Sequence, residues 1–237
     1  MTAALEISGV IKDYKGLRPV RIEHLSAAPG EQVAVLGLDA ASAEILVNLI
    51  TGTTLPDLGE IRVSGELTSA IRDSNAWMTF VDRIGIVSER AVLLDALSVV
   101  QNLAIPLSLD VEPLPPDLRS RAEALAAEVG LQPSVWEGRA ADLDPASRVR
   151  VRLGRALALN PALVLIEHPS SNLAREHVTR LGHDIRNIVA RRGAAGITLT
   201  ADKDVAQAFA DRPLKLDPAT GRLTNLRRTW LDRFTNM

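Results

Sequence analysis

The sequence predicts an α/β fold with a mostly parallel core sheet, N-terminal antiparallel strands and a helical subdomain. Short apolar segments typical of buried strands alternate with segments of helical periodicity, which is the pattern of a parallel sheet covered by helices. The segment from about residue 90 to 160 interrupts this alternation, because it has helical patterns and few runs of β-branched residues. At 237 residues and 46% hydrophobic, the chain can bury a core of this kind. We predict one domain over 1–237, with its core formed by 1–89 and 161–237.

Three short strands are predicted before the first helix, separated by the turn-like segments KDYKG and APGEQ. After Gly37, apolar residues recur at helical spacing, so a helix is expected up to about Thr51. The three predicted strands are Leu5–Val10, Val20–Leu25 and Gln32–Leu36.

The rest of the chain continues the same alternation. A turn and a short strand precede a second core-like strand, RIGIVSE, which begins at Arg83 and stops at polar residues. Beyond the helical part, the segment ALVLIE predicts a buried strand, the following segment a long helix, and GITLT another buried strand. A last strand, PLKLD from Pro213, is expected at the edge of the sheet.

Composition excludes several classes of protein. The net charge of −2 gives no electrostatic basis for binding nucleic acid, so no nucleic-acid partner is expected. The absence of cysteine excludes disulfides and thiolate metal sites. The N-terminus, MTAALEISGV, lacks the features of a signal peptide, and no run of about 18 apolar residues predicts a membrane span.

A strand, a turn beginning at Gly37 and a helix form the layout of a phosphate-binding loop. Such loops use glycines at positive φ to aim backbone N–H groups at phosphate, a lysine to reach the phosphates, and a hydroxyl to bind Mg²⁺. The turn here, GLDAASAE, has neither the later glycines nor the lysine. The sequence therefore keeps the frame of a nucleotide site while losing most of its chemistry.

The order of the segments resembles the ATP-binding cassette (ABC) family, the nucleotide-hydrolysing subunits of ABC transporters. The segments GEQVAVLG, RIGIVSERAVLLDALSVVQNLAIPL and RLGRALALNPALVLIEHPSSNL fall in family order and spacing, over nearly the whole chain. Two phrases, PSSNL and SVVQNLAIPL, are similar to the lipoprotein-releasing, macrolide-export or lipid-trafficking ATPases. The resemblance implies a P-loop NTPase-like ABC ATPase fold with ATP and Mg²⁺ as cofactors.

The resemblance also implies partners and a location. These are a membrane permease subunit and a second ABC subunit, in a homo- or heterodimer, with the chain cytoplasmic and peripheral on the inner face of the cell membrane. In such dimers each ATP lies between one subunit's phosphate loop and the other's signature segment. Both elements are substituted here, so neither a homodimer nor a heterodimer forms a complete composite site.

In the phosphate loop, Ala43 stands at the position of the lysine and Glu44 at that of the metal-binding hydroxyl. Tyr14 matches the aromatic residue that stacks on adenine, and Glu89 stands at the position of the glutamine that names the family's glutamine loop. The positions that the resemblance assigns to cofactor binding are Tyr14, Gly37, Ala40, Ser42, Ala43, Glu44, Ile45 and Glu89.

The other motifs of the family are substituted as well. Glu167 stands where the family has the Mg²⁺-coordinating Asp, and His168 where it has the catalytic Glu. Ala201 occupies the position of the switch histidine. The signature segment is LDPAS, with its family positions at Asp144, Pro145, Ala146 and Ser147.

Each substitution also has a structural interpretation. Glu44 is expected in the first turn of a helix, where its carboxylate would interact with the helix N-terminus in place of a phosphate. Asp144 and Pro145 form an N-cap and first-turn pair. His168 is interpreted as a hydrogen-bonded histidine at a strand end, with a catalytic base as the alternative. Tyr14 is either a stacking platform for adenine or a partly buried aromatic residue.

No metal site is predicted, because His177 and His183 are six residues apart, which is the wrong spacing for one helix face.

The coordinated substitutions lead to a first hypothesis of a degenerate, weakly or non-hydrolysing cassette that serves as a structural or regulatory subunit with a membrane permease. The alternative is an active ATPase that powers transport and uses Glu167, Glu89 and His168 in altered roles, so enzymatic activity is left open. A third hypothesis is the binding of another anion or a regulatory nucleotide through Tyr14.

Overall fold

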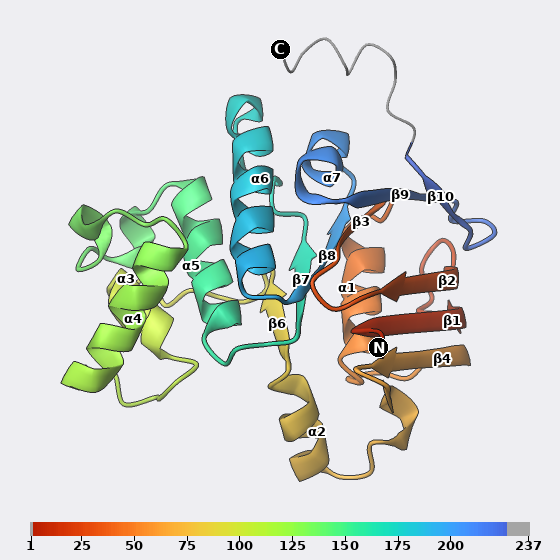
Figure 1. The fold of residues 1–237 in the computed structure, drawn as a ribbon, viewed down its shortest axis with the longest axis horizontal. Helices are drawn as coiled ribbons and strands as arrows, with labels where there is room; N and C mark the ends of the chain where they lie inside the picture. The colour runs from red at the N-terminus through yellow and green to blue at the C-terminus, as the bar shows by residue number, and fades with distance from the viewer. Residues whose placement is uncertain (1, 227–237) are drawn as a thin grey trace.

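The computed structural model describes residues 2–226, so the last part of the predicted domain, 227–237, lies outside the described residues. Two sheets and a group of helices make up the fold (Figure 1). The central sheet has six strands in the order β10-β9-β3-β8-β7-β6. Each pair of neighbouring strands is parallel except β9 and β10, which are antiparallel. Its strands are β3 (Gln32–Leu36), β6 (Ile84–Val87), β7 (Leu163–Glu167), β8 (Ala195–Thr200), β9 (Arg212–Leu216) and β10 (Leu223–Asn225).

A second, antiparallel sheet has the order β2-β1-β4-β5 and confirms the expected N-terminal antiparallel strands. Helix α1 (Ala40–Ile50) lies between the two sheets, and its apolar face joins a core to which both sheets contribute. The core is aliphatic, with Leu46, Leu49 and Ile50 fully buried. The strands of this sheet are β1 (Leu5–Lys12), β2 (Val20–Ala27), β4 (Leu58–Val63) and β5 (Glu66–Leu67).

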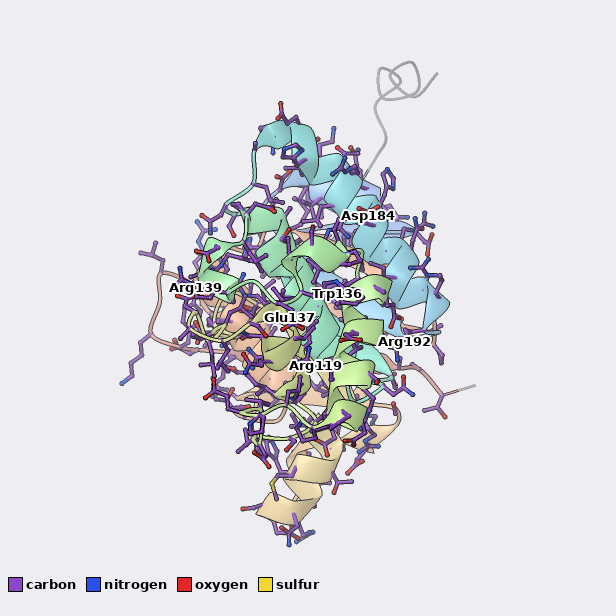
Figure 2. The ribbon with its side chains drawn as sticks, turned by 90° about the vertical axis from the view of Figure 1, so that its left-hand side faces the viewer. Arg119, Trp136, Glu137, Arg139, Asp184 and Arg192 are labelled. Atoms are coloured by element: carbon purple, nitrogen blue, oxygen red, sulfur yellow. The ribbon has the colours of Figure 1, made fainter. Side chains whose placement is uncertain are left out.

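The helical part and the opposite face of the central sheet share a second core. Side chains of β7, including Val164 and Ile166, pack in this core with apolar residues of the helical part and of α6. Ion pairs join the helices, Arg192 with Glu128 and Arg150 with Asp184. Figure 2 labels Asp184 in α6 and Arg192 at the end of this helix. The helices are α3 (Val99–Ala104), α4 (Pro116–Glu128), α5 (Pro145–Leu157), α6 (Arg175–Arg191) and α7 (Lys203–Phe209).

Two features differ from the sequence prediction. Strand β9, which contains the first four residues of PLKLD, was expected at the edge but lies inside the sheet, because the chain reverses after it and adds β10 outside it. Helix α2 (Ser74–Val81), which the sequence analysis did not predict, forms between β5 and β6. It begins where the Asp73 carboxylate accepts hydrogen bonds from the N–H groups of Asn75 and Ala76.

Candidate functional site

The phosphate-loop frame is present at the end of β3. Gly37 has φ +108°, a region that favours glycine, and a Cβ there would lie 3.2 Å from the carbonyl oxygen of Leu216. Helix α1 starts at Ala40, so Ala40 and Ser42 are helical, and neither has the positive φ of a phosphate-binding glycine. The loop is therefore shorter, and its helix starts earlier, than a phosphate cradle requires.

Asp39 is the N-cap of α1. Its carboxylate accepts a hydrogen bond of 2.8 Å from the N–H of Ser42. Hydrogen bonds from the backbone and side chain of Ser42 lower the pKa of Asp39; partial burial opposes this, and the nearby charge of His168 adds to it. A carboxylate of the chain itself therefore bonds to the helix N-terminus, where anions are stabilised.

The prediction that Glu44 lies in the first turn of the helix is wrong. Because α1 begins at Ala40, Glu44 is the fifth helical residue and lies beyond the first turn, which holds no acidic residue. The carboxylate at the helix N-terminus belongs to Asp39 instead. A phosphate-binding loop would start the helix later in the chain, which would put Glu44 in the first turn. The Asp39 cap starts the helix at Ala40 instead.

A guanidinium group occupies the space between the two acidic residues at the metal-binding positions. Arg90, in the loop after β6, donates from Nη2 and Nε to the carboxylate of Glu167, the Nε contact being 3.3 Å, and from Nη1 to Oε1 of Glu44 at 3.4 Å. The hydroxyl of Ser88 donates to Oε2 of Glu167 at 2.9 Å. Glu167 is 8% exposed, so its charge needs a partner, and Arg90 supplies it.

His168 follows β7 with φ +40°, an uncommon conformation for a residue other than glycine. Its N–H donates to the carbonyl of Leu199 at 2.9 Å, and its carbonyl accepts from Ser171. The buried Nε2 of the ring has no hydrogen-bond partner among the described residues, so the expected hydrogen bond to the ring is not found at this atom. The backbone, rather than Nε2, ties this residue to the strand end.

Two further family positions lie away from this cluster. Glu89 accepts hydrogen bonds from Ser171 Oγ at 3.0 Å and from Asn172, so it faces the turn after β7 rather than Glu44. Ala201 is exposed after β8, and its neighbour Asp202 caps α7. Glu89 therefore stabilises the turn after β7, and Asp202, rather than Ala201, stabilises the start of α7.

The N-terminus of α5 has the capping geometry that the sequence predicted. Asp144 is the N-cap, and its carboxylate accepts hydrogen bonds from the N–H of Ser147 at 3.0 Å and from its Oγ at 2.6 Å. Pro145 is the first helical residue, and Ala146 follows it. The signature positions thus form a complete helix start with its carboxylate already bonded.

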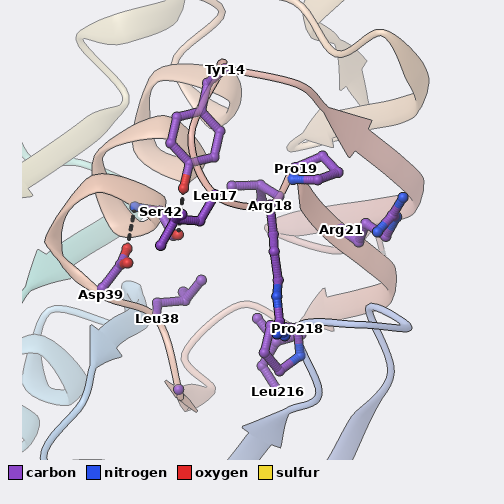
Figure 3. A pocket seen from close by; sticks show the side chains of 12 residues that line it. Tyr14, Leu17, Arg18, Pro19, Arg21, Leu38, Asp39, Ser42, Leu216 and Pro218 are labelled. Carbon is purple, nitrogen blue, oxygen red and sulfur yellow. Dashed lines mark hydrogen bonds between the residues drawn. The ribbon is translucent and has the colours of Figure 1, made fainter.

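Tyr14 lies over the start of α1, with its hydroxyl 3.3 Å from Ser42 Oγ (Figure 3). It lines a cavity of about 300 Å³ together with Leu17, Arg18 and Asp39. Arg18 extends along this cavity toward Pro218. Tyr14 is half-buried and contacts Ser42 in the first turn of α1, while Ile45 in the same helix packs against the core.

The groups present do not fit Mg-ATP. A metal between Glu44 and Glu167 would have to displace the Arg90 guanidinium, and a phosphate at the helix N-terminus would meet the Asp39 carboxylate. Within residues 2–226, no cluster of three or more His, Cys, Asp or Glu residues is arranged to hold a metal ion. Over the same residues, no helix is long and apolar enough to cross a membrane.

Asp39 and Arg90, the two residues that fill these places, are not predicted from the sequence. Asp39 could have been identified as a cap, because Asp directly before a helix is a common N-cap. Arg90 gives no comparable signal, because its contacts join segments about 46 and 77 residues away in the chain.

Asp39→Ala is expected to lower the free energy of unfolding by about 1 kcal/mol at pH 7, because α1 loses its cap. The pKa of Asp39 is lowered in the folded chain, so its contribution is present above its ordinary unfolded pKa of about 3.9 and is lost as the pH falls through the folded value. Urea unfolding should therefore give a constant difference between pH 7 and about pH 5 that shrinks below about pH 4. Asp39→Asn, which keeps a capping oxygen, should cost less at pH 7; an equal loss would contradict the capping role.

Comparison with known proteins identifies the family. The family model for the ABC transporter matches residues 21–171. The lipoprotein-releasing system ATP-binding protein LolD of Chromohalobacter salexigens is 32% identical over 204 residues, which cover 84% of this chain and 82% of that protein.

Solved structures have the same fold. The cassette MJ0796, in a dimer bound to ADP and Pi, has a TM-score of 0.73 at 23% identity and covers 95% of this chain and 100% of its own. The structure of cbiO1 from Clostridium perfringens has a TM-score of 0.79 at 20% identity, covering 94% of this chain and 88% of its own. The fold is thus that of an ABC ATPase cassette, and the chain belongs to the ABC transporter ATP-binding subunit family.

Proposed function

We propose that this chain is a degenerate ABC cassette that does not hydrolyse ATP and that serves as a structural or regulatory subunit of a transporter. The observation that carries the proposal is the position of Arg90, whose guanidinium bridges Glu44 and Glu167 where the family places a metal. Asp39 supports it, because its carboxylate takes the N–H of Ser42 at the helix N-terminus. An internal cation and an internal anion thus stand where Mg²⁺ and phosphate would bind.

The absence of the family's catalytic side chains also supports a cassette that does not hydrolyse ATP. The Nε2 atom of His168 is buried and has no hydrogen-bond partner among the described residues, and the Glu89 carboxylate is bonded within the turn after β7. Ala201 offers no polar side chain at the switch position. A general base must lie within hydrogen-bond reach of the proton that it removes, and the position next to the strand end holds no carboxylate free for that task.

We further propose that the chain works beside a membrane permease and a second ABC subunit, at the inner face of the cell membrane. The relatives are named as parts of such assemblies: LolD as the ATP-binding protein of a lipoprotein-releasing system, and cbiO1 as part of the ABC transporter complex cbiONQ. In this chain the loop after β6 exposes Val92 and Leu94, at 67% and 49%, which suits contact with a partner.

Calorimetric titration of the purified chain with Mg-ATP is expected to show no binding tighter than about 1 mM. The MJ0796 cassette, which binds ADP and Pi in its solved dimer, is the positive control. A micromolar affinity for Mg-ATP, with phosphate release by the chain alone or with a second ABC subunit, would support the active ATPase instead.

The same titration on a variant that restores the family residues at two positions is a more specific test. Ala43→Lys with Glu44→Ser should leave Mg-ATP binding weak, because Arg90 still neutralises Glu167 and Asp39 still caps the helix. Ala43 is fully buried, so circular dichroism must first show that the variant is folded. Micromolar binding by this double variant would mean that the internal ion pairs do not block the site.

A further inference from the structure

A cavity of about 330 Å³ lies where the end of α1 meets α2 and the residues just before it. Trp77 of α2 lines this cavity, and its indole Nε1–H donates to the carbonyl oxygen of Thr51, the C-cap of α1, at 2.9 Å. The side chains of Ile71 and Leu55 are apolar parts of the same lining. Because the bond to Thr51 fixes the orientation of the indole, the cavity has an ordered aromatic wall with aliphatic neighbours.

The cavity is separate from the candidate nucleotide site. Asp39 caps the first turn of α1, whereas the cavity begins after the last residue of this helix. A helix of 11 residues is about 16 Å long, so the two places lie well apart. Helix α2 lies at the lower end of the molecule in Figure 1. None of the positions that the family resemblance assigns to the nucleotide lines this cavity.

Two charged residues of the lining have hydrogen-bonding groups to spare. Arg72 is exposed and forms no hydrogen bond or ion pair within residues 2–226. The Asp73 carboxylate accepts from the N–H groups of Asn75 and Ala76 through Oδ1 alone, so its Oδ2 has no partner in the same part of the chain. A guanidinium binds carboxylates, and a carboxylate oxygen accepts from an ammonium group. The cavity therefore offers one cation and one anionic acceptor beside an aromatic wall.

The lining also contains a buried hydroxyl group that the chain leaves unsatisfied. Thr68 is 3% exposed, and its Oγ1 has no hydrogen-bond partner among the described residues. Buried polar atoms nearly always have a partner, because leaving one unpaired costs its full desolvation. The polar groups of this cavity are thus not all satisfied by the chain itself.

We propose that this cavity binds a free aromatic amino acid, with its ring against Trp77, its carboxylate on Arg72 and its ammonium group on Oδ2 of Asp73. Charge complementarity carries the proposal: a zwitterion matches both residues, whereas a simple anion is repelled by Asp73 and a simple cation by Arg72. An aromatic ring is favoured because pairs of aromatic rings are stabilised beyond the area that they bury. The volume is at the low end for small-molecule sites, which suits a single amino acid. The inference goes beyond the proposed function, because it involves neither the nucleotide site nor the permease.

The indole N–H resonances of the full chain, labelled with ¹⁵N, report on this binding directly. The chain has three tryptophans, and the variant Trp77→Phe identifies the resonance of Trp77. Titration with L-phenylalanine should shift this resonance with a Kd of about 1 mM, as expected for so small a ligand. The resonance of Trp136, whose Nε1–H donates to the carbonyl of Leu131 in the helical part, should stay in place as an internal control. L-Alanine, which lacks the ring, should cause no shift up to about 10 mM.

Matched ligands and variants separate the two charged contacts. Phenylalaninamide lacks the carboxylate and N-acetylphenylalanine lacks the ammonium group, so each should bind about fivefold more weakly than phenylalanine. Arg72→Gln should abolish the preference for phenylalanine over phenylalaninamide and keep the preference over N-acetylphenylalanine. Asp73→Asn, which keeps an oxygen to cap α2, should have the reverse effect.

Arg121→Gln, at an exposed position of α4, is the control variant and should preserve both preferences. Circular dichroism of each variant checks that it is folded. The inference would be overturned by an unshifted Trp77 resonance at about 10 mM phenylalanine, or by equal binding of the three aromatic ligands. It would also be overturned by a preference that survives the substitution designed to remove it.

Discussion

Arg90→Ala is expected to lower the free energy of unfolding by about 2–3 kcal/mol, with a fall in Tm of about 5–10 °C. The substitution leaves the Glu167 carboxylate, only 8% exposed, without its counterion, and leaves Glu44 nearby with the same charge. Removing one partner of a fully buried pair costs about 3–5 kcal/mol. The side chain of Arg90 is 42% exposed, so water compensates for part of that loss. Urea unfolding and differential scanning calorimetry measure the change.

Two further variants make this result specific. Arg62→Ala removes an arginine of similar exposure, 41%, whose partner Glu60 is 59% exposed, and should cost about 0.5 kcal/mol or less. Combining Arg90→Ala with Glu167→Gln should recover much of the stability, because the uncompensated charge is gone. Equal losses for Arg90→Ala and Arg62→Ala would show that Arg90 is an ordinary surface cation.

Gly59→Ala is expected to destabilise the chain by more than about 4 kcal/mol, the largest effect of any substitution considered. Gly59 lies in β4 with φ +84°, and the pairing of β1 with β4 shifts register between Ser8 and Ile11. A Cβ at this position would lie 2.5 Å from the carbonyl oxygen of Ser8 and against the carbonyl of Gly9. These are backbone atoms of a neighbouring strand, so relief requires separation of the two strands.

Gly193→Ala is the control that separates the steric clash at Gly59 from the conformational cost of a positive φ. Gly193 has φ +68°, but a Cβ there meets no atom within 4 Å, so only the conformational penalty of about 1–2 kcal/mol applies. Urea unfolding of both variants should show a clearly larger loss for Gly59→Ala. A similar loss at the two positions would mean that the strands of the antiparallel sheet separate at little cost.

Local sequence pattern was sufficient for most of the fold. The strands around Val33 and Leu165 and the helix after Gly37 were predicted from apolar periodicity, which involves only residues close together in the chain. The Asp144 cap was predicted for the same reason, since a cap and its helix lie together in the chain. Strand β9 was misplaced because its position depends on a second hairpin strand, β10, whose three residues give little signal of their own.

The candidate site was predicted only in part. The substituted positions could be found one at a time, but what replaced the lost groups could not, because the replacements come from other segments. Arg90 reaches Glu44 and Glu167 only after β6, β7 and α1 have assembled. Asp39 was treated as one more residue of a loop, whereas it ends that loop and starts the helix.

The guanidinium between Glu44 and Glu167 is joined to the chain by covalent bonds, so it is present once in every folded molecule at a fixed local concentration. A dissolved ion fills a site according to its concentration, and it can be removed by dilution or by a chelator. Arg90 cannot be removed in either way. We therefore expect the conformation of the loop that carries Val92 to be independent of the magnesium concentration and of the ratio of ATP to ADP around it. Under the proposed function, a transporter that contains this cassette would have one half whose shape does not respond to the energy supply of the cell.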